Sequence, residues 1–434
     1  MNTFMKAHRK ARREQAVVSE SKFKKLIKKN LLPLLPGACL KASTGKGPNS
    51  RTTVTFRGPC TLSLKPTPKS VFHFEVTRSQ PFAKASAREQ VAEYNLAQSF
   101  VQSVQAIAPG LGEVFETDIV KGLGRRIVAG AIKQDARQRR TVLTIMDQMT
   151  RWAARSYEGK PISAAMGVNE DRGGDVEFRE TCNADFAAVL TNGSDTMIEC
   201  SADGKIRSYH ALAAPAILPE YAPHRLAGLA EWSKGGKIGL SLNRSGEILV
   251  LKHSRLVFVC RRGKWSFLTH EPIITQMGCP QSRAIRRAVY SSALDASFAR
   301  TGACIGIVTS GYVANNAWKA AVPKTADHLQ ALESPKTAAL AQMIGCNKFQ
   351  ELDRRFRQEL LAIDGATLIG HDGTVLAVGA ILKIEGGSTG GGRLAAAQTL
   401  SQYGLGIKVS QDGPIQGFRS EPGVLPSEPV FSVM

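Results

Sequence analysis

Three short groups of residues near the C-terminal end of the chain have the types and spacing that phosphate chemistry uses. The first is Asp364-Gly365-Ala366, a carboxylate beside two small residues. The second is a loop with glycines at positions 386, 387, 390, 391 and 392 that ends at Arg393. The third is Ser410-Gln411-Asp412, which follows a short apolar run. Carboxylates bind divalent cations, and a glycine-rich backbone with an arginine suits a phosphate.

The segment after the glycine-rich loop predicts a helix. Residues 393–402 are rich in Ala and Leu, and Gly404 then supplies a helix stop. Glycines let the backbone approach a ligand closely, and the first-turn N–H groups together with the helix dipole favour an anion. We therefore predict a phosphate site that includes Gly391, Gly392 and Arg393. Two plainer interpretations stay open, namely that the loop is only a flexible connection and that Asp364 only caps a turn.

Short β-type runs surround these groups and must position them. An Asp-Gly pair at 372–373 separates two runs and predicts a hairpin turn, and a second pair at 412–413 separates two more. We predict an α/β domain over residues 270–420 in which the glycine-rich loop lies next to Asp364. The segments expected in its sheet begin near residues 303, 366, 375, 407 and 415.

The order of these elements resembles the diadenylate cyclase (DAC) family, which includes the DisA N-terminal domain and joins two ATP molecules into cyclic di-AMP. The resemblance spans about residues 290–419 and rests on the three residue groups, the hairpin and the Ala-rich helix. The run Arg300-Thr301-Gly302-Ala303-Cys304-Ile305-Gly306-Ile307-Val308 is similar to an early strand of that family.

The resemblance implies roles for particular residues and groups. Asp364 would bind Mg²⁺ or Mn²⁺ and approach the ribose hydroxyl of a facing nucleotide, which makes it the candidate catalytic residue. Two protomers would meet face to face, each holding one ATP. The implied nucleotide-binding residues are Asp364, Gly365, Ala366, Gly391, Gly392, Arg393, Ser410 and Gln411.

Two departures from the family pattern bear on catalysis. Active cyclases have Gly-Thr-Arg-His-Arg where this chain has Gly391-Gly392-Arg393-Leu394-Ala395, and Ser-Glu-Glu where it has Ser410-Gln411-Asp412. Loss of one electrostatic stabiliser commonly costs about a hundredfold or more in rate. The pattern is closer to the DACNV type of proposed nucleotide sensors. We therefore predict a sensor or regulatory protein that binds ATP or a cyclic dinucleotide and is an inactive or weak cyclase. The alternative is an active cyclase in which Asp412 replaces the lost metal ligand.

Length and local patterning predict the organisation of the rest. A chain of 434 residues holds two or three domains, and we expect an α+β arrangement overall. Residues 1–30 have the composition of a frayed helix or a disordered stretch. The expected segments are a basic N-terminal arm (1–40), a linker and helical region (41–158), an antiparallel β-rich region (159–269), the DAC-like domain (270–420) and a loose tail (421–434).

The formal net charge of +21 is concentrated outside the candidate nucleotide site. Basic residues gather between Lys6 and Lys29 and again between Arg125 and Arg140, which we read as one helix. Such clusters bind nucleic acid through phosphates, so a nucleic-acid-binding protein is a second alternative. An ordinary solvated surface is the plainer interpretation, and it was also our interpretation of the charged run from Glu351 to Glu359.

Other classes of site are disfavoured by spacing. The eight cysteines are scattered, with no Cys-x-x-Cys pair and no His at ligand spacing, so we expect no zinc. No apolar run approaches the 18 or so residues that cross a bilayer. We therefore expect a cytoplasmic protein without a membrane partner, and a homo-oligomer is implied only by the family resemblance.

Overall fold

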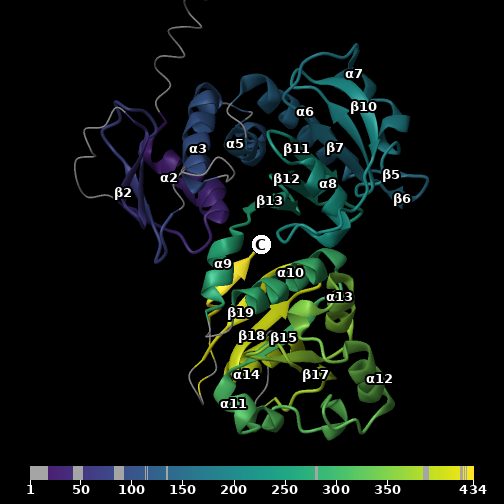
Figure 1. The fold of residues 1–434 in the computed structure, drawn as a ribbon. Helices are drawn as coiled ribbons and strands as arrows, with labels where there is room; N and C mark the ends of the chain where they lie inside the picture. Colours follow the sequence, from purple (N-terminus) through teal and green to yellow (C-terminus); the bar gives the residue numbers. More distant parts are fainter. Residues whose placement is uncertain are drawn as a thin grey trace, which may run out of the picture. The chain divides into compact units, whose positions relative to one another are not determined.

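The computed structural model divides the chain into two compact units, drawn in Figure 1. Unit 1 comprises residues 1–214 and 228–267, and unit 2 comprises residues 215–227 and 268–434. The residues that the structure describes are 18–42, 52–82, 92–112, 114, 116–132, 135–278, 282–384, 391–420, 424, 426 and 428–434. Helices combine with mixed parallel and antiparallel sheets, which confirms the predicted α/β class.

Unit 1 begins with a helix that packs into the core. In α2 (Glu20–Leu26) the apolar side chains fall on one face, so Phe23 and Leu26 are buried while the lysines between them are exposed. Ile27 and Leu31 continue the buried face into a short π-helical turn. The prediction of a frayed or disordered stretch is therefore wrong from Val18 onward, because it weighed composition and not the spacing of these apolar residues. Residues 1–17 lie outside the described part of the chain.

A small β-sheet and four helices follow. The sheet has the order β1-β4-β3-β2 and is antiparallel. The sequence around residues 52–76 predicts either a loop-rich linker or a small β element, and the second alternative is confirmed. Asp135 caps α6 by accepting from the N–H groups of Arg137 and Gln138, which splits the predicted single basic helix in two. Met146 and Met149 are fully buried core residues. The bounds are β1 Cys39–Ala42, β2 Val54–Gly58, β3 Thr61–Leu64, β4 Phe74–Thr77, α3 Glu93–Ile107, α4 Glu116–Lys121, α5 Leu123–Ile132 and α6 Ala136–Trp152.

The second half of unit 1 is an eight-stranded sheet of order β14-β13-β12-β11-β7-β9-β10-β8. It is antiparallel as predicted except that β7 and β9 are parallel. The apolar run from Phe186 to Leu190 predicts a strand, but the structure has a 3₁₀ helix at Asp185–Ala188 and leaves Phe186, Val189 and Leu190 exposed. The bounds are β5 Ser156–Tyr157, β6 Lys160–Pro161, β7 Ala164–Val168, β8 Val176–Glu177, α7 Phe178–Thr181, β9 Thr196–Cys200, β10 Lys205–Ala211, α8 Ala227–Trp232, β11 Ile238–Leu242, β12 Ile248–Lys252, β13 Arg255–Arg261 and β14 Lys264–Phe267.

Unit 2 is built on a six-stranded mixed sheet of order β17-β16-β15-β18-β19-β20. The five segments predicted to share one sheet do so, which is confirmed by their register. The sixth strand, β20, pairs with β19 and lies in the segment predicted to be a loose tail, so that prediction is wrong there. The bounds are α9 His270–Gln276, α10 Arg283–Ala299, β15 Ala303–Val308, α11 Ser310–Ala314, α12 Pro335–Ile344, α13 Arg354–Ala362, β16 Ala366–Gly370, β17 Val375–Ala380, α14 Gly392–Ser401, β18 Gly404–Val409, β19 Ile415–Phe418 and β20 Phe431–Val433.

Helices cover both faces of this sheet (Figure 1). Leu400 of α14 packs on Gly306 of one face, and Thr367, which points to the other face, donates to the Leu360 carbonyl of α13. Strands β15, β16 and β17 are therefore buried along their whole length, as strands covered on both sides are. No helix in the described residues has the length and apolar character needed to cross a lipid bilayer.

The charged run before Asp364 is only partly solvated. Arg354 and Arg357 of α13 are 7% and 8% exposed, whereas Arg355 between them is exposed. Our interpretation of the whole run as a solvated face is therefore wrong, because positions 354 and 357 are three residues apart and share the inner face of the helix.

Candidate functional site

The register of the unit 2 sheet brings the predicted residue groups to one edge. Ala303 of β15 pairs with Val409 of β18, and Cys304 pairs with Ala366 of β16. The residues just outside these pairs therefore lie at the same end of three adjacent strands. Neighbouring strands are about 4.8 Å apart, so the groups at 364–365, 301–302 and 410–411 are brought side by side although they are far apart in the sequence.

Arg393 reaches this edge from α14. Its Nη2 donates to the Thr301 carbonyl at 3.4 Å. A Cβ atom on Gly302 would lie 2.7 Å from Arg393 Nη1 and 3.2 Å from Gln411 Cγ, and Gly302 has a φ of +67°. Only glycine fits there without displacing these side chains or straining the backbone. Arg393 and Gln411, predicted separately, thus meet at Gly302.

Arg300, Thr301 and Gly302 also lie at this edge, although they are not among the residues predicted from the sequence. Arg300 donates from Nη1 to the Gln411 carbonyl at 3.0 Å and has a left-handed φ of 62° at the end of α10. The signal for them in the sequence is the Thr-Gly pair directly before an apolar strand. Residues Arg300 to Gly302 complete the edge between Asp364 and Ser410.

The start of α14 is fixed by close packing against the sheet. A Cβ on Gly406 of β18 would lie 1.8 Å from the Ala397 carbonyl oxygen, so the helix backbone rests directly on the strand. Gly391 caps the helix with a φ of 86°, and a Cβ on Gly391 or Gly392 would meet nothing within 4 Å. Gly391 and Gly392, at the start of α14, therefore face open space. Residues 385–390, which hold the other glycines of the predicted loop, lie outside the described residues.

Asp364 precedes β16 at the same edge. Its side chain is exposed, and its Oδ1 accepts from the Gly365 N–H at 3.1 Å. Gly365 has a φ of +106°, and a Cβ there would lie 2.6 Å from the carbonyl carbon of Gly379. The side chain of Ala366 is buried in the core, so only its backbone is available to a ligand. Asp364 is the member of this predicted group with an exposed side chain.

The third group forms the turn after β18. Ser410 N–H donates to the Pro414 carbonyl at 2.9 Å, and Gly413 N–H donates back to the Ser410 carbonyl at 2.9 Å. Gln411 and Asp412 are exposed. In the described part of the chain, no group of three or more His, Cys, Asp and Glu side chains is placed to hold a metal ion. Carboxylate, thiol and imidazole side chains in the described part of the chain therefore do not complete a metal site at Asp364 or Asp412.

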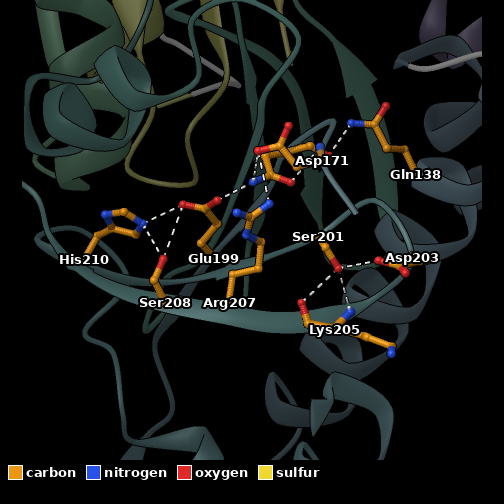
Figure 2. Close-up of polar contacts among 10 residues, drawn as sticks. Gln138, Asp171, Glu199, Ser201, Asp203, Lys205, Arg207, Ser208 and His210 are labelled. Atoms are coloured by element: carbon orange, nitrogen blue, oxygen red, sulfur yellow. Dashed lines mark hydrogen bonds and ion pairs between the residues drawn. The ribbon is translucent and has the colours of Figure 1, made fainter. Parts of the chain in front are cut away.

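A polar cluster on unit 1 has the residue types of a catalytic triad without its geometry. Figure 2 shows His210 Nε2 between Glu199 Oε2, at 2.6 Å, and Ser208 Oγ, at 2.9 Å. In a triad the acid contacts Nδ1 and leaves Nε2 for the serine. Here one nitrogen serves both partners, so His210 cannot relay a proton from Ser208 to Glu199. The cluster links strands β9 and β10.

Some residues of the predicted basic clusters form ion pairs within unit 1. Arg125 Nη1 lies 2.7 Å from Asp147 Oδ1, and Lys22 Nζ lies 2.6 Å from Glu116 Oε2. Residues Lys24, Lys25, Lys28 and Lys29 are exposed on one side of the N-terminal helix. We call these four residues the α2 lysine face. Lys6 and the other basic residues before Val18 lie outside the described residues, as does Lys133.

Comparison with known proteins does not identify a family for this chain. No family model matches the chain, and no curated protein matches it. Among solved structures, a double cysteine mutant of DacA from Staphylococcus aureus is a weak neighbour, with 14% sequence identity and a TM-score of 0.20. The match covers 27% of this chain and 84% of that one. DacA is a diadenylate cyclase.

Proposed function

We propose that unit 2 binds an adenine nucleotide, ATP or a cyclic dinucleotide, at the sheet edge between Asp364 and Gln411, and that it acts as a sensor or regulatory domain. The observation that carries the proposal is the position of Arg393. Its guanidinium lies against Gly302 and beside Gln411, next to the first turn of α14. A cation beside the N-terminal turn of a helix favours a phosphate.

A divalent cation fits this site only together with a nucleotide. Mg²⁺ is usually bound through one or two carboxylates plus substrate phosphates and retains several waters. Asp364 offers one exposed carboxylate and Asp412 another, on the two sides of β15. When bound, the metal would neutralise phosphate charge. Asp364 would hold and orient it, and Arg393 would hold the phosphate.

The environment of α14 supports binding without appreciable cyclisation. Leu394 and Ala395 occupy the positions where active cyclases of the resembled family carry His and Arg. Ala395 is buried, and Leu394 packs against the core of unit 2. Neither side chain can offset charge that develops in a transition state, and loss of one such group commonly costs about a hundredfold or more.

Nucleotide binding is expected to stabilise unit 2, and Arg393→Ala is expected to weaken that effect. At a free ligand concentration one hundred times the dissociation constant, ATP with Mg²⁺ should add about 2.7 kcal/mol to the free energy of unfolding. Thermal unfolding with and without ATP and Mg²⁺ measures the gain. The exposed Arg355→Ala is the matched control and should retain the full gain, whereas Arg393→Ala should lose most of it.

Two results would contradict the proposal. If ATP and cyclic di-AMP leave wild-type unfolding unchanged at millimolar concentration, the nucleotide site is absent. If the protein instead converts ATP to cyclic di-AMP over many turnovers, the sensor reading is wrong and Asp412→Asn becomes the variant that tests for a replacement metal ligand.

The α2 lysine face supports a second candidate function, the binding of DNA or RNA. Four exposed lysines on one side of α2 and of the π-helical turn that follows it, whose other side is buried, give a fixed and mainly basic surface. Reversing Lys24, Lys25, Lys28 and Lys29 to Glu should abolish salt-dependent binding to a mixed-sequence duplex in a fluorescence anisotropy titration at low ionic strength. Deletion of residues 1–30 cannot serve as the test, because it also removes Phe23 and Ile27 from the core. Reversal of Lys234 and Lys237 is the control, and undiminished binding by the four-lysine variant would exclude this surface.

A further inference from the structure

A second site in unit 2 is suggested by an arginine-lined cavity of about 540 Å³. Ligand pockets for small molecules commonly measure about 300–1,000 Å³. The cavity lies against α10 and the start of α13, and one wall is formed by the apolar segment Ala216-Ile217-Leu218. Its charged lining residues are Arg283, Arg287, Arg354, Arg357 and Glu220.

Carboxylates neutralise three of these four arginines. Glu271 accepts from Arg283 at 2.6 Å and from Arg287 at 3.0 Å. Asp295 accepts from Nε and Nη2 of Arg354 at 2.6 and 2.9 Å. Glu271 is therefore shared by two arginines, Glu220 lies 3.5 Å from Arg287 as its second acidic partner, and each of these three arginines has an anionic partner.

Arg357 differs from the other three. It is 8% exposed, its Nε has no hydrogen-bond partner, and it forms no ion pair with a carboxylate in the described part of the chain. Its guanidinium carbon lies 5.7 Å from the centre of the Phe349 ring. Burial, with the nearby charge of Arg354, lowers the pKa of Arg357 to about 10, so it remains charged at neutral pH. A buried cation without a partner destabilises the fold, and a bound anion would relieve that cost.

We propose that this cavity binds a phosphorylated small molecule, with its phosphate at Arg357 and Arg287 and its less polar part on Ile217 and Leu218. A phosphate accepts from several guanidinium groups at once, and the planar arginine fork matches its oxygens. The first turn of α10, which begins at Arg283, adds the positive end of a helix dipole. The apolar wall and the volume indicate a ligand larger than inorganic phosphate.

The cavity is distinct from the candidate nucleotide site. It contacts residues 283–291 of α10, whereas Gly302 lies beyond the C-terminal end of that helix. A helix of 17 residues is about 25 Å long. One ligand therefore does not fill both sites, and each can be tested in a variant of the other.

Calorimetric titration of the full chain with sodium pyrophosphate, at constant ionic strength, tests the proposal. Arg357→Met should weaken pyrophosphate binding at this site at least tenfold, whereas the exposed Arg355→Met on the same helix should bind like the wild type. Without anion, Arg357→Met should unfold at the same temperature as the wild type or higher, because the buried cation is gone. Arg283→Gln, at the exposed rim, should also weaken binding and does not alter the core.

Two further results separate this proposal from the nucleotide site. Arg393→Ala should retain pyrophosphate binding at the cavity, and Arg357→Met should retain ATP binding at the sheet edge. The proposal is overturned if pyrophosphate does not bind the wild type at millimolar concentration, or if only Arg393→Ala loses it. It is also overturned if Arg357→Met and Arg355→Met bind equally well.

Discussion

Replacing Asp295 by Ala is expected to destabilise unit 2 by about 3–5 kcal/mol, because removal of one partner from a buried ion pair leaves the other charge uncompensated. The Asp295 side chain is fully buried and holds two nitrogens of Arg354. It also accepts from the His224 N–H at 2.9 Å. Loss of this carboxylate leaves the charges of Arg354 and Arg357 together in the interior.

The same variant should loosen a segment far away in the sequence. Arg354 donates to the carbonyl oxygens of Pro219 at 2.6 Å and Ala222 at 2.7 Å. The Asp295–Arg354 pair therefore holds residues 219–224 against α10 and α13. Hydrogen exchange read by mass spectrometry follows each unit separately. Peptides from 219–224, α10 and β15 should exchange faster in Asp295→Ala, and peptides from unit 1 should not change.

Two controls make this prediction specific. Glu359→Ala, an exposed acid on α13, should change stability by no more than about 0.5 kcal/mol. The double variant Asp295→Leu with Arg354→Met should recover much of the loss, because apolar replacement of both members of a buried pair is often neutral or stabilising. An Asp295→Ala protein with wild-type exchange throughout unit 2 would show that the ion pair contributes little.

Phe23→Ala is expected to destabilise unit 1 by about 3–5 kcal/mol, the usual cost of a large aromatic truncation in a core. Phe23 is fully buried, and its ring centre lies 5.7, 6.1 and 6.3 Å from those of Phe100, Phe74 and Phe72. The side chain thus joins α2 to α3 and to the β4 side of the small sheet.

Urea unfolding with hydrogen exchange on α3 and β4 measures the effect of Phe23→Ala. The neighbouring Lys24→Ala changes an exposed residue of the same helix and should be nearly neutral, within about 0.5 kcal/mol. If the two variants are equally stable, residues 18–31 do not belong to the cooperative core of unit 1.

Local patterns predict the residues of the candidate site but do not show that these residues lie close together. Asp364, Arg393 and Gln411 were each predicted from a short motif or from the family resemblance. Their proximity depends on the parallel pairing of β15 with β16 and the antiparallel pairing of β15 with β18. Strand order arises from long-range packing, which a local pattern does not contain, so Gly302 was recognised as the meeting point only in the folded unit.

The sequence by itself determined the elements whose signals are local. Helix α3 is predicted by the spacing of its apolar residues and by the helix-ending pair Pro109-Gly110, and α14 by its Ala-rich and Leu-rich sequence before Gly404. The two Asp-Gly pairs predict the two hairpin turns of unit 2. These features depend on residues within a few positions of one another.

Only the tertiary structure decided which charged and apolar residues are buried. Arg354 and Arg357 belong to the same charged run as the exposed Arg355, but packing against α10 and the contact with Asp295 put the first two inside. Phe23 follows a basic segment, yet the apolar sheet and α3 give it a core. Burial is set by what lies opposite a side chain in space, and for these residues the opposing groups are about 50 to 130 positions away in the chain.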